Sequence, residues 1–222
     1  MQNILEADSI RKDFGDKQIL TDIYLKCRTG DIIGLLGRNG TGKSTLLKIL
    51  FGTLYTDHKH ISINGILSDQ PYEQMGTISF LNQGNFLPKH LTAKQIIQLF
   101  GSHLDKKEFF DDTLLSKIGD IKIKYLSGGE LRYLEIKIIL NTDSKFVFLD
   151  EPFNGLAPIH IDIVKELIRE QSKTKGIILT DHDYSNVLDV ANKYIILIDG
   201  GLKVLKTRQE FIDWGYIPDK KQ

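Results

Sequence analysis

The sequence predicts an α/β fold, a doubly wound parallel sheet into which a helical subdomain is inserted. Three uninterrupted apolar runs, each followed by polar or glycine-rich residues and then a helical pattern, are typical of parallel strands buried on both faces. They cover Ile32–Leu36, Phe146–Leu149 and Ile177–Leu179. Between about residues 83 and 141 the pattern instead turns helical. Because ligands of such sheets bind at the carboxyl ends of the strands, the residues after the three runs are the first candidates for a site.

Shorter patterns predict further strands. Ile23–Cys27 alternates apolar and polar residues, which indicates a half-buried strand. Ile61–Ile63 leads into Asn64-Gly65, the pattern of a strand entering a tight turn. Near the end of the chain, Tyr194–Ile198 and Leu202–Leu205 predict a hairpin around an Asp-Gly-Gly turn, followed by a short tail.

Helical signals lie between the strands. Thr92–Gln95 and Asp105–Glu108 have the spacing of a helix capping box. Phe110, Leu114 and Ile118 repeat every four residues, which predicts one apolar helical face. Apolar residues at helical spacing predict two further helices, one through Leu46, Leu47, Ile49 and Leu50 and one through Ile163, Val164, Leu167 and Ile168.

The composition is that of an ordinary globular protein and excludes several classes. The chain has 222 residues, of which 41% are apolar and 26% charged, so it is not a disordered chain. Basic and acidic residues number 29 each, which gives no general attraction to nucleic acid, and we expect no nucleic-acid partner. The single cysteine, Cys27, cannot form an internal disulfide. Without a membrane-spanning run or a secretory signal, we expect a soluble cytoplasmic protein that a partner would have to hold at a membrane.

Residues 37–44, Gly-Arg-Asn-Gly-Thr-Gly-Lys-Ser, match the phosphate-binding pattern G-x-x-x-x-G-K-[ST]. The glycines let successive N–H groups point at one anion, Lys43 would reach the β and γ phosphates, and the Ser44 hydroxyl would bind Mg²⁺. A glycine-rich turn that only caps a helix is the alternative. The buried strand before the segment and the apolar helix after it favour phosphate binding. The expected nucleotide contacts are Gly37, Asn39, Gly40, Thr41, Gly42, Lys43, Ser44 and Thr45.

Two acidic residues follow the second buried run. Asp150, the first to leave the strand, suits Mg²⁺, and Glu151, one residue further out, could take the proton from an attacking water. An apolar run ending in Asp-Glu is weak evidence alone, since strand ends are often acidic for solubility. Its position downstream of the phosphate loop makes a catalytic role the better interpretation.

A third motif, Leu126–Glu130, reads Leu-Ser-Gly-Gly-Glu. It resembles the signature sequence of ATP-binding-cassette (ABC) ATPases, commonly Leu-Ser-Gly-Gly-Gln. Ser127 and Glu130 also have capping-box spacing, and Gly128 and Gly129 leave N–H groups open to an anion. A well-capped helix start is therefore compatible with phosphate binding at the same place.

The resemblance covers essentially the whole chain. It implies a single ABC ATPase domain over residues 1–222, with a P-loop NTPase core, a mostly parallel sheet and N-terminal antiparallel strands. The core would comprise residues 1–82 and 142–222, and residues 83–141 would form the helical subdomain that carries the signature.

The resemblance also implies roles for three residues outside the main motifs. Phe14 stands at the family's aromatic adenine platform, usually Tyr. Gln83, after the expected strand Thr77–Leu81, matches the glutamine that touches Mg²⁺ and senses the transmembrane partner. His182, after Ile177–Thr180, matches the switch histidine at the γ phosphate. In the family two cassettes pair head to tail, so the ATP held by one chain would be completed in trans by Ser127, Gly128, Gly129 and Glu130 of the other.

The sequence departs from the common family pattern at two further places. Tyr133 stands where an arginine usually follows the signature, and Arg132 lies one place early. Ala157 stands where many members have a dimer-contacting aspartate. The stretch Gly155–Pro158 is similar to the corresponding one of branched-chain amino acid importer ATPases.

The function that the resemblance implies is the Mg²⁺-dependent ATPase subunit of an ABC transporter. It would work with transmembrane permease subunits at the cytoplasmic face of the cell membrane, paired with a second copy of itself or a related cassette. One alternative is a soluble ABC ATPase of the iron–sulfur assembly or DNA-repair type, disfavoured by the absence of a coiled-coil insertion, of zinc-spaced cysteines and of a basic excess. The other is a nucleotide-binding module without hydrolysis, disfavoured by the intact Lys43, Asp150, Glu151 and His182.

Overall fold

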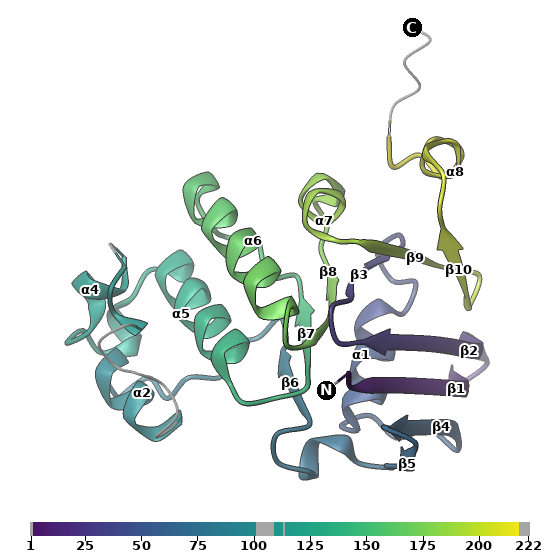
Figure 1. The fold of residues 1–222 in the computed structure, drawn as a ribbon, viewed down its shortest axis with the longest axis horizontal. Coiled ribbons are helices and arrows are strands. Elements are labelled where there is room, and N and C mark those ends of the chain that lie inside the picture. Colours follow the sequence, from purple (N-terminus) through teal and green to yellow (C-terminus); the bar gives the residue numbers. More distant parts are fainter. Residues whose placement is uncertain (1, 101–108, 113, 218–222) are drawn as a thin grey trace, which may run out of the picture.

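The larger of two sheets contains six strands, and the three uninterrupted apolar runs form its centre (Figure 1). In the computed structural model, which describes residues 2–100, 109–112 and 114–217, these strands are β3 (Ile32–Leu36), β6 (Ile78–Leu81), β7 (Phe146–Asp150), β8 (Gly176–Thr180), β9 (Lys193–Ile198) and β10 (Gly201–Leu205). Their order is β10-β9-β3-β8-β7-β6. Neighbours run parallel, except that β10 pairs antiparallel with β9. The mostly parallel α/β core is therefore confirmed.

The smaller sheet is antiparallel and comes mainly from the N-terminal part of the chain. It consists of β1 (Ile4–Phe14), β2 (Lys17–Arg28), β4 (His58–Ile63) and β5 (Ile66–Leu67). These strands are ordered β2-β1-β4-β5. The alternation at residues 23–27 predicts only part of β2, and no alternation predicts β1. The pairing of β1 with β2 shifts register between Ala7 and Ile10, and Ser9 has a φ of 55°, so irregularities interrupt the period of two.

The large sheet separates two hydrophobic cores. Along β7, Phe146 and Phe148 belong to the core shared with the small sheet and α1 (Lys43–Phe51), whereas Val147 and Leu149 belong to the other core. Because both faces of this strand are buried, its sequence shows no polar alternation. The second core is covered by α5 (Gly128–Asn141), α6 (Pro158–Ser172) and α7 (Tyr184–Val190).

Residues 83–141 contribute helices that lie beyond β6 in Figure 1, away from the small sheet. The first of them, α2 (Ala93–Phe100), begins at the expected capping box. There the N–H of Gln95 donates to Thr92 Oγ1 (3.2 Å) and the N–H of Thr92 donates to Gln95 Oε1 (2.9 Å). The second expected box, Asp105–Glu108, lies outside the described residues.

The predicted helical face through Phe110, Leu114 and Ile118 is wrong. Phe110 lies in a turn, and α4 (Leu115–Ile118) begins only at Leu115. The cause is Asp112, whose Oδ1 accepts hydrogen bonds from the N–H groups of Leu114 (3.1 Å) and Leu115 (2.6 Å) and so marks a new helix start.

The segment after the C-terminal hairpin is more than the expected tail. Thr207 and Glu210 form a capping box that starts α8 (Arg208–Asp213). Phe211 of this helix packs edge-on against Tyr194 of β9, with 5.1 Å between the ring centroids. The Thr-x-x-Glu spacing at residues 207–210 is the sequence signal that predicts this helix.

Within the part of the chain that the structure describes, none of the helices has the length and apolar content that crossing a bilayer requires.

Candidate functional site

The loop between β3 and α1 is built by glycines whose backbone angles other residues rarely adopt. Gly37 has a φ of 147° and Gly42 a φ of 109°, and a Cβ atom on Gly42 would lie 2.6 Å from Cγ2 of Ile19. Gly42 is also the N-cap of α1 and supplies no side-chain cap. The N–H groups of the first turn of α1 therefore stay open to an anion at the positive end of the helix dipole.

The Lys43 amine lies across this loop. Its Nζ donates to the carbonyl oxygens of Gly37 (2.7 Å) and Arg38 (3.1 Å), and Thr41 Oγ1 donates to the Arg38 carbonyl (2.9 Å). Burial lowers the pKa of Lys43, and the acidic residues at the end of β7 oppose that shift. The loop thus holds an amine where phosphate oxygens could replace its carbonyl partners.

Asp150 ends β7 and is 1% exposed. Its Oδ1 atom has no hydrogen-bond partner among the described residues. Burial raises the pKa of Asp150, while a hydrogen bond with the Ser44 hydroxyl acts in the opposite direction. A buried carboxylate oxygen without a partner, beside a hydroxyl, matches the oxygen ligands that Mg²⁺ prefers, so these residues fit the expected metal.

Glu151 is where three adjacent strand ends meet. Its Oε1 accepts a hydrogen bond from Nε2 of Gln83 (2.8 Å), which follows β6, and lies 2.6 Å from Nε2 of His182, which follows β8. The same Gln83 nitrogen is 3.4 Å from the Ser44 hydroxyl oxygen. Burial raises the pKa of Glu151, although His182 opposes the shift. A raised pKa makes this carboxylate a better proton acceptor than an exposed one.

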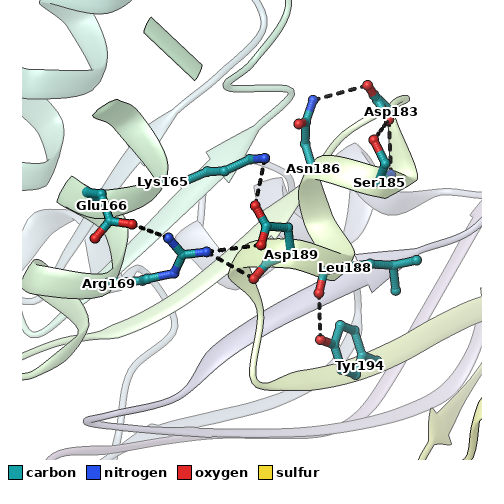
Figure 2. Close-up of polar contacts among 9 residues, drawn as sticks. All are labelled: Lys165, Glu166, Arg169, Asp183, Ser185, Asn186, Leu188, Asp189 and Tyr194. Atoms are coloured by element: carbon teal, nitrogen blue, oxygen red, sulfur yellow. Dashed lines mark hydrogen bonds and ion pairs between the residues drawn. The ribbon is translucent and has the colours of Figure 1, made fainter. Parts of the chain in front are cut away.

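The helix after the β8 loop is held to its neighbour (Figure 2). Asp183 caps α7 by accepting a hydrogen bond from the N–H of Ser185 (3.0 Å). Farther along α7, Asp189 accepts hydrogen bonds from Lys165 (2.8 Å) and Arg169 (3.2 Å) of α6. These contacts hold α7, the helix that follows the loop carrying His182, against α6.

Most of the sequence-predicted residues line one cavity of about 420 Å³, although Gly37, Thr41 and Asp150 are not among its lining residues. Phe14 reaches it with a side chain that is 51% exposed, and Lys12 Nζ lies 5.1 Å from the centroid of its ring. The residues lining this cavity are Phe14, Ile19, Asn39, Gly40, Gly42, Lys43, Ser44, Thr45, Gln83, Glu151 and His182.

The signature residues form a separate helix start. Ser127 caps α5 in a capping box. The N–H of Ser127 donates to Glu130 Oε2 (2.8 Å), and the N–H of Glu130 donates to Ser127 Oγ (3.3 Å). A Cβ atom on Gly129 would lie 2.9 Å from the carbonyl oxygen of Gly155, whereas Gly128 faces open space. Among the described residues that line the cavity, none comes from residues 127–130. The structure therefore does not bring the signature to the phosphate loop of the same chain.

Arg132, for which the sequence predicts no role, lies directly behind the site. Its guanidinium donates to the main-chain carbonyl oxygens of Asn82, Asp150 and Glu151, each at 2.8 Å. Arg132 is 6% exposed. The sequence could indicate only that Arg132 lies on the helix that begins at the signature. The carbonyl oxygens that accept its hydrogen bonds lie far away in the chain, and no motif spacing points to them.

The two departures from the family pattern have simple structural settings. Tyr133 is buried, and its hydroxyl lies 3.2 Å from Asp112 Oδ2, so it packs in the helical segment away from the phosphate loop. Ala157 is the N-cap of α6 and makes no side-chain cap, and the helix starts instead with Pro158.

Comparisons with known proteins agree on one family. Residues 20–154 match the ABC transporter family. The chain is 30% identical to the lipopolysaccharide export system ATP-binding protein LptB of Acidithiobacillus ferridurans, over 96% of this chain and 94% of that protein. It is 33% identical to a probable sulfate/thiosulfate import ATP-binding protein, CysA, of Chlorella vulgaris, over 93% and 92% of the two chains. The soluble alternative is therefore not favoured.

Solved structures show the same fold. An ATP-binding subunit of an ABC transporter superposes with a TM-score of 0.83 at 23% identity, over 96% of this chain and 94% of the other. A nucleotide-free ATP-binding cassette gives a TM-score of 0.77 at 22% identity, over 97% and 96%. The chain belongs to the ABC transporter family and is an ATP-binding, ATP-hydrolysing transporter subunit.

Proposed function

We propose that the cavity over the phosphate loop is the ATP site of this subunit. The β and γ phosphates would lie against Lys43 and the open N–H groups at the start of α1, and the adenine would stack on Phe14. The glycine angles of the loop, the uncapped helix start and the lining of the cavity support this assignment.

Glu151 is the general base in this proposal. The observation that carries it is the meeting of Gln83 and His182 on one oxygen of the Glu151 carboxylate, beside Lys43 and Ser44. Gln83 and His182 would orient the water and the γ phosphate, respectively, while the carboxylate takes the proton. Lys43 would neutralise charge on the phosphates, because phosphoryl transfer depends mainly on positioning and electrostatic stabilisation.

Asp150, Ser44 and Gln83 would hold Mg²⁺ in the same proposal. The bound ion supplies a charge that neutralises the phosphates. The support is the unpartnered Oδ1 of Asp150, which lies in a buried position next to the Ser44 hydroxyl. Because no protein group competes for this oxygen among the described residues, it would be available to the metal ion.

A complete site would need a second chain. Ser127, Gly128, Gly129 and Glu130 would contact ATP held by the partner, since they do not line the cavity of their own chain. The start of α5 could receive an anion, because Gly128 faces open space. The expected pair is a head-to-tail homodimer with two-fold symmetry, closed around ATP.

We further propose that residues 83–141 act as a subdomain that contacts transmembrane permease subunits at the cytoplasmic face of the membrane. Residues 1–82 and 142–222 would form the nucleotide-binding core. The relatives LptB and CysA are ATP-binding proteins of an export and an import system, which supports a membrane partner. The segment 83–141 begins with Gln83, whose side chain contacts Glu151, so a movement of the segment would be passed to the base through this hydrogen bond.

The substitution Glu151→Gln tests the base. The amide is nearly isosteric but cannot take a proton, so ATP should bind with unchanged affinity while phosphate release falls by about 100-fold or more. Nucleotide affinity is measured by titration and turnover by phosphate release. Lys43→Ala is the contrasting variant and should weaken binding itself. Parental turnover in Glu151→Gln would show that Glu151 is not the base.

A further inference from the structure

One buried guanidinium connects the two segments that carry the groups around the base. Arg132 donates to the carbonyl oxygen of Asn82, immediately before Gln83, and to the carbonyl oxygens of Asp150 and Glu151. The ends of β6 and β7 are therefore held by the same side chain. Gln83 and Glu151 in turn meet through the 2.8 Å hydrogen bond between their side chains.

A buried carboxylate on the next turn of α5 completes the connection. Glu135 is fully buried, and its Oε1 accepts a hydrogen bond from the N–H of Phe86 (2.9 Å). Its Oε2 lies 3.8 Å from Arg132 Nη1. Arg132 and Glu135 together hold both ends of the segment 82–86, which contains Gln83. Burial raises the pKa of Glu135, while Arg132 opposes that shift.

The helix that carries this pair begins at the signature. Ser127 caps α5, and Arg132 lies on its second turn, within one continuous helix from Gly128 to Asn141. A displacement of the helix start would move the guanidinium along with it, because a hydrogen-bonded helix transmits such a shift along its axis. The guanidinium would then displace the main chain at its three carbonyl acceptors, and with it both the base Glu151 and Gln83.

We infer that Arg132 is a positioning residue, which sets the main chain of Glu151 and Gln83 relative to the signature helix and so makes the base responsive to the ATP that the signature contacts. This inference rests on the proposed base role of Glu151. The planar guanidinium suits this task because its fork of donors can reach several carbonyl oxygens at once, which a lysine ammonium cannot do in the same geometry.

The first test is Arg132→Lys, which keeps the charge and loses the fork. Turnover should fall by about 10- to 100-fold, because a misplacement of about 1 Å at the reacting groups costs about that much in rate. KM for ATP should change by less than about threefold, because Arg132 does not line the nucleotide cavity. An unchanged kcat would overturn the proposal. A loss confined to KM would overturn it too.

A double-mutant cycle separates positioning from general destabilisation. If Arg132 acts on turnover through Glu151, Arg132→Lys should change the residual turnover of Glu151→Gln by less than about twofold, because the base that it positions is already gone. A purely structural role would instead lower the residual turnover by the same factor as in the parent. If Glu151→Gln alone keeps parental turnover, the base assignment fails, which is distinguishable from a failure of the Arg132 proposal.

Lys175 provides the matched control. It is 7% exposed, and its ammonium also donates to main-chain carbonyl oxygens, those of Leu140 and Thr142 at the other end of α5. Lys175→Met should lower the melting temperature while leaving kcat within about twofold of the parent, because its acceptors lie away from the base. An equal loss of kcat in Lys175→Met and Arg132→Lys would overturn the proposal. Arg132→Gln is the second variant, and failure of both Arg132 variants to fold would show a structural role alone.

Discussion

Gly42→Ala tests how tightly the phosphate loop is packed against β2. Gly42 has a φ of 109°, and a Cβ atom there would lie 2.6 Å from Cγ2 of Ile19, a separation that real side chains do not adopt. Gly40 is the matched control: its φ is 77°, but a Cβ atom would meet nothing within 4 Å. The two substitutions therefore share backbone strain and differ in packing.

The expected change in the free energy of unfolding is the sum of three contributions. A left-handed backbone costs a residue with a Cβ about 1–2 kcal/mol. Forcing a methyl into a filled space costs about 1–3 kcal/mol more, at Gly42 only. Replacing glycine also stabilises by about 0.4–1 kcal/mol through the unfolded chain. The free energy of unfolding should therefore fall by about 1–5 kcal/mol for Gly42→Ala. For Gly40→Ala, which lacks the packing contribution, the loss should be smaller by about 1–3 kcal/mol.

Urea unfolding of the nucleotide-free protein, followed by circular dichroism, measures both values. Ile19→Ala removes the Cγ2 atom that the new methyl would meet, so Gly42→Ala in that background should cost no more than Gly40→Ala. Equal destabilisation by Gly42→Ala and Gly40→Ala would show that the methyl at residue 42 meets no filled space. A cost at Gly42 that Ile19→Ala leaves unchanged would exclude Ile19 as the side chain that the methyl meets.

Two further predictions concern the nucleotide and the base. Phe14→Ala should weaken ATP binding by about 1–3 kcal/mol in a nucleotide titration, by analogy with base stacking on other aromatic side chains, and an unchanged Kd would remove Phe14 from the site. Burial raises the pKa of Glu151, so the base becomes protonated, and kcat falls, as the pH drops through a value above the 4.5 of an ordinary glutamate. A pH–rate profile that stays flat down to pH 4.5 would contradict this.

The sequence predicts the centre of the fold because the central strands are buried on both faces. Their uninterrupted apolar runs stand out from the rest of the chain, and the loop at residues 37–44 follows one of them. Two-residue turns are equally visible: Asn64 and Gly65, with φ values of 53° and 79°, join β4 to β5. These features are local, so a single sequence is enough to find them.

The elements that escape prediction depend on contacts or on interrupted patterns. β1 is missed because its irregular pairing breaks the alternation. The start of α4 is misplaced because the Asp112 carboxylate accepts the N–H groups of Leu114 and Leu115. In the candidate site, the sequence provides the residues at the strand ends but not their shared partner. Arg132 contacts residues 18 to 50 positions away in the chain, and only the folded structure brings them together.

The central claim about the molecule is that each chain holds two halves of different ATP sites, one at the phosphate loop and one at the signature. The direct measurement is the molar mass of Glu151→Gln by size-exclusion chromatography with light scattering, with and without ATP and Mg²⁺. We expect a stable dimer with ATP, a monomer or weak dimer without it, and no dimer when Ser127→Arg is added, because a bulky cation would occupy the place of the γ phosphate. A doubly substituted chain that still forms the ATP-dependent dimer would contradict the claim.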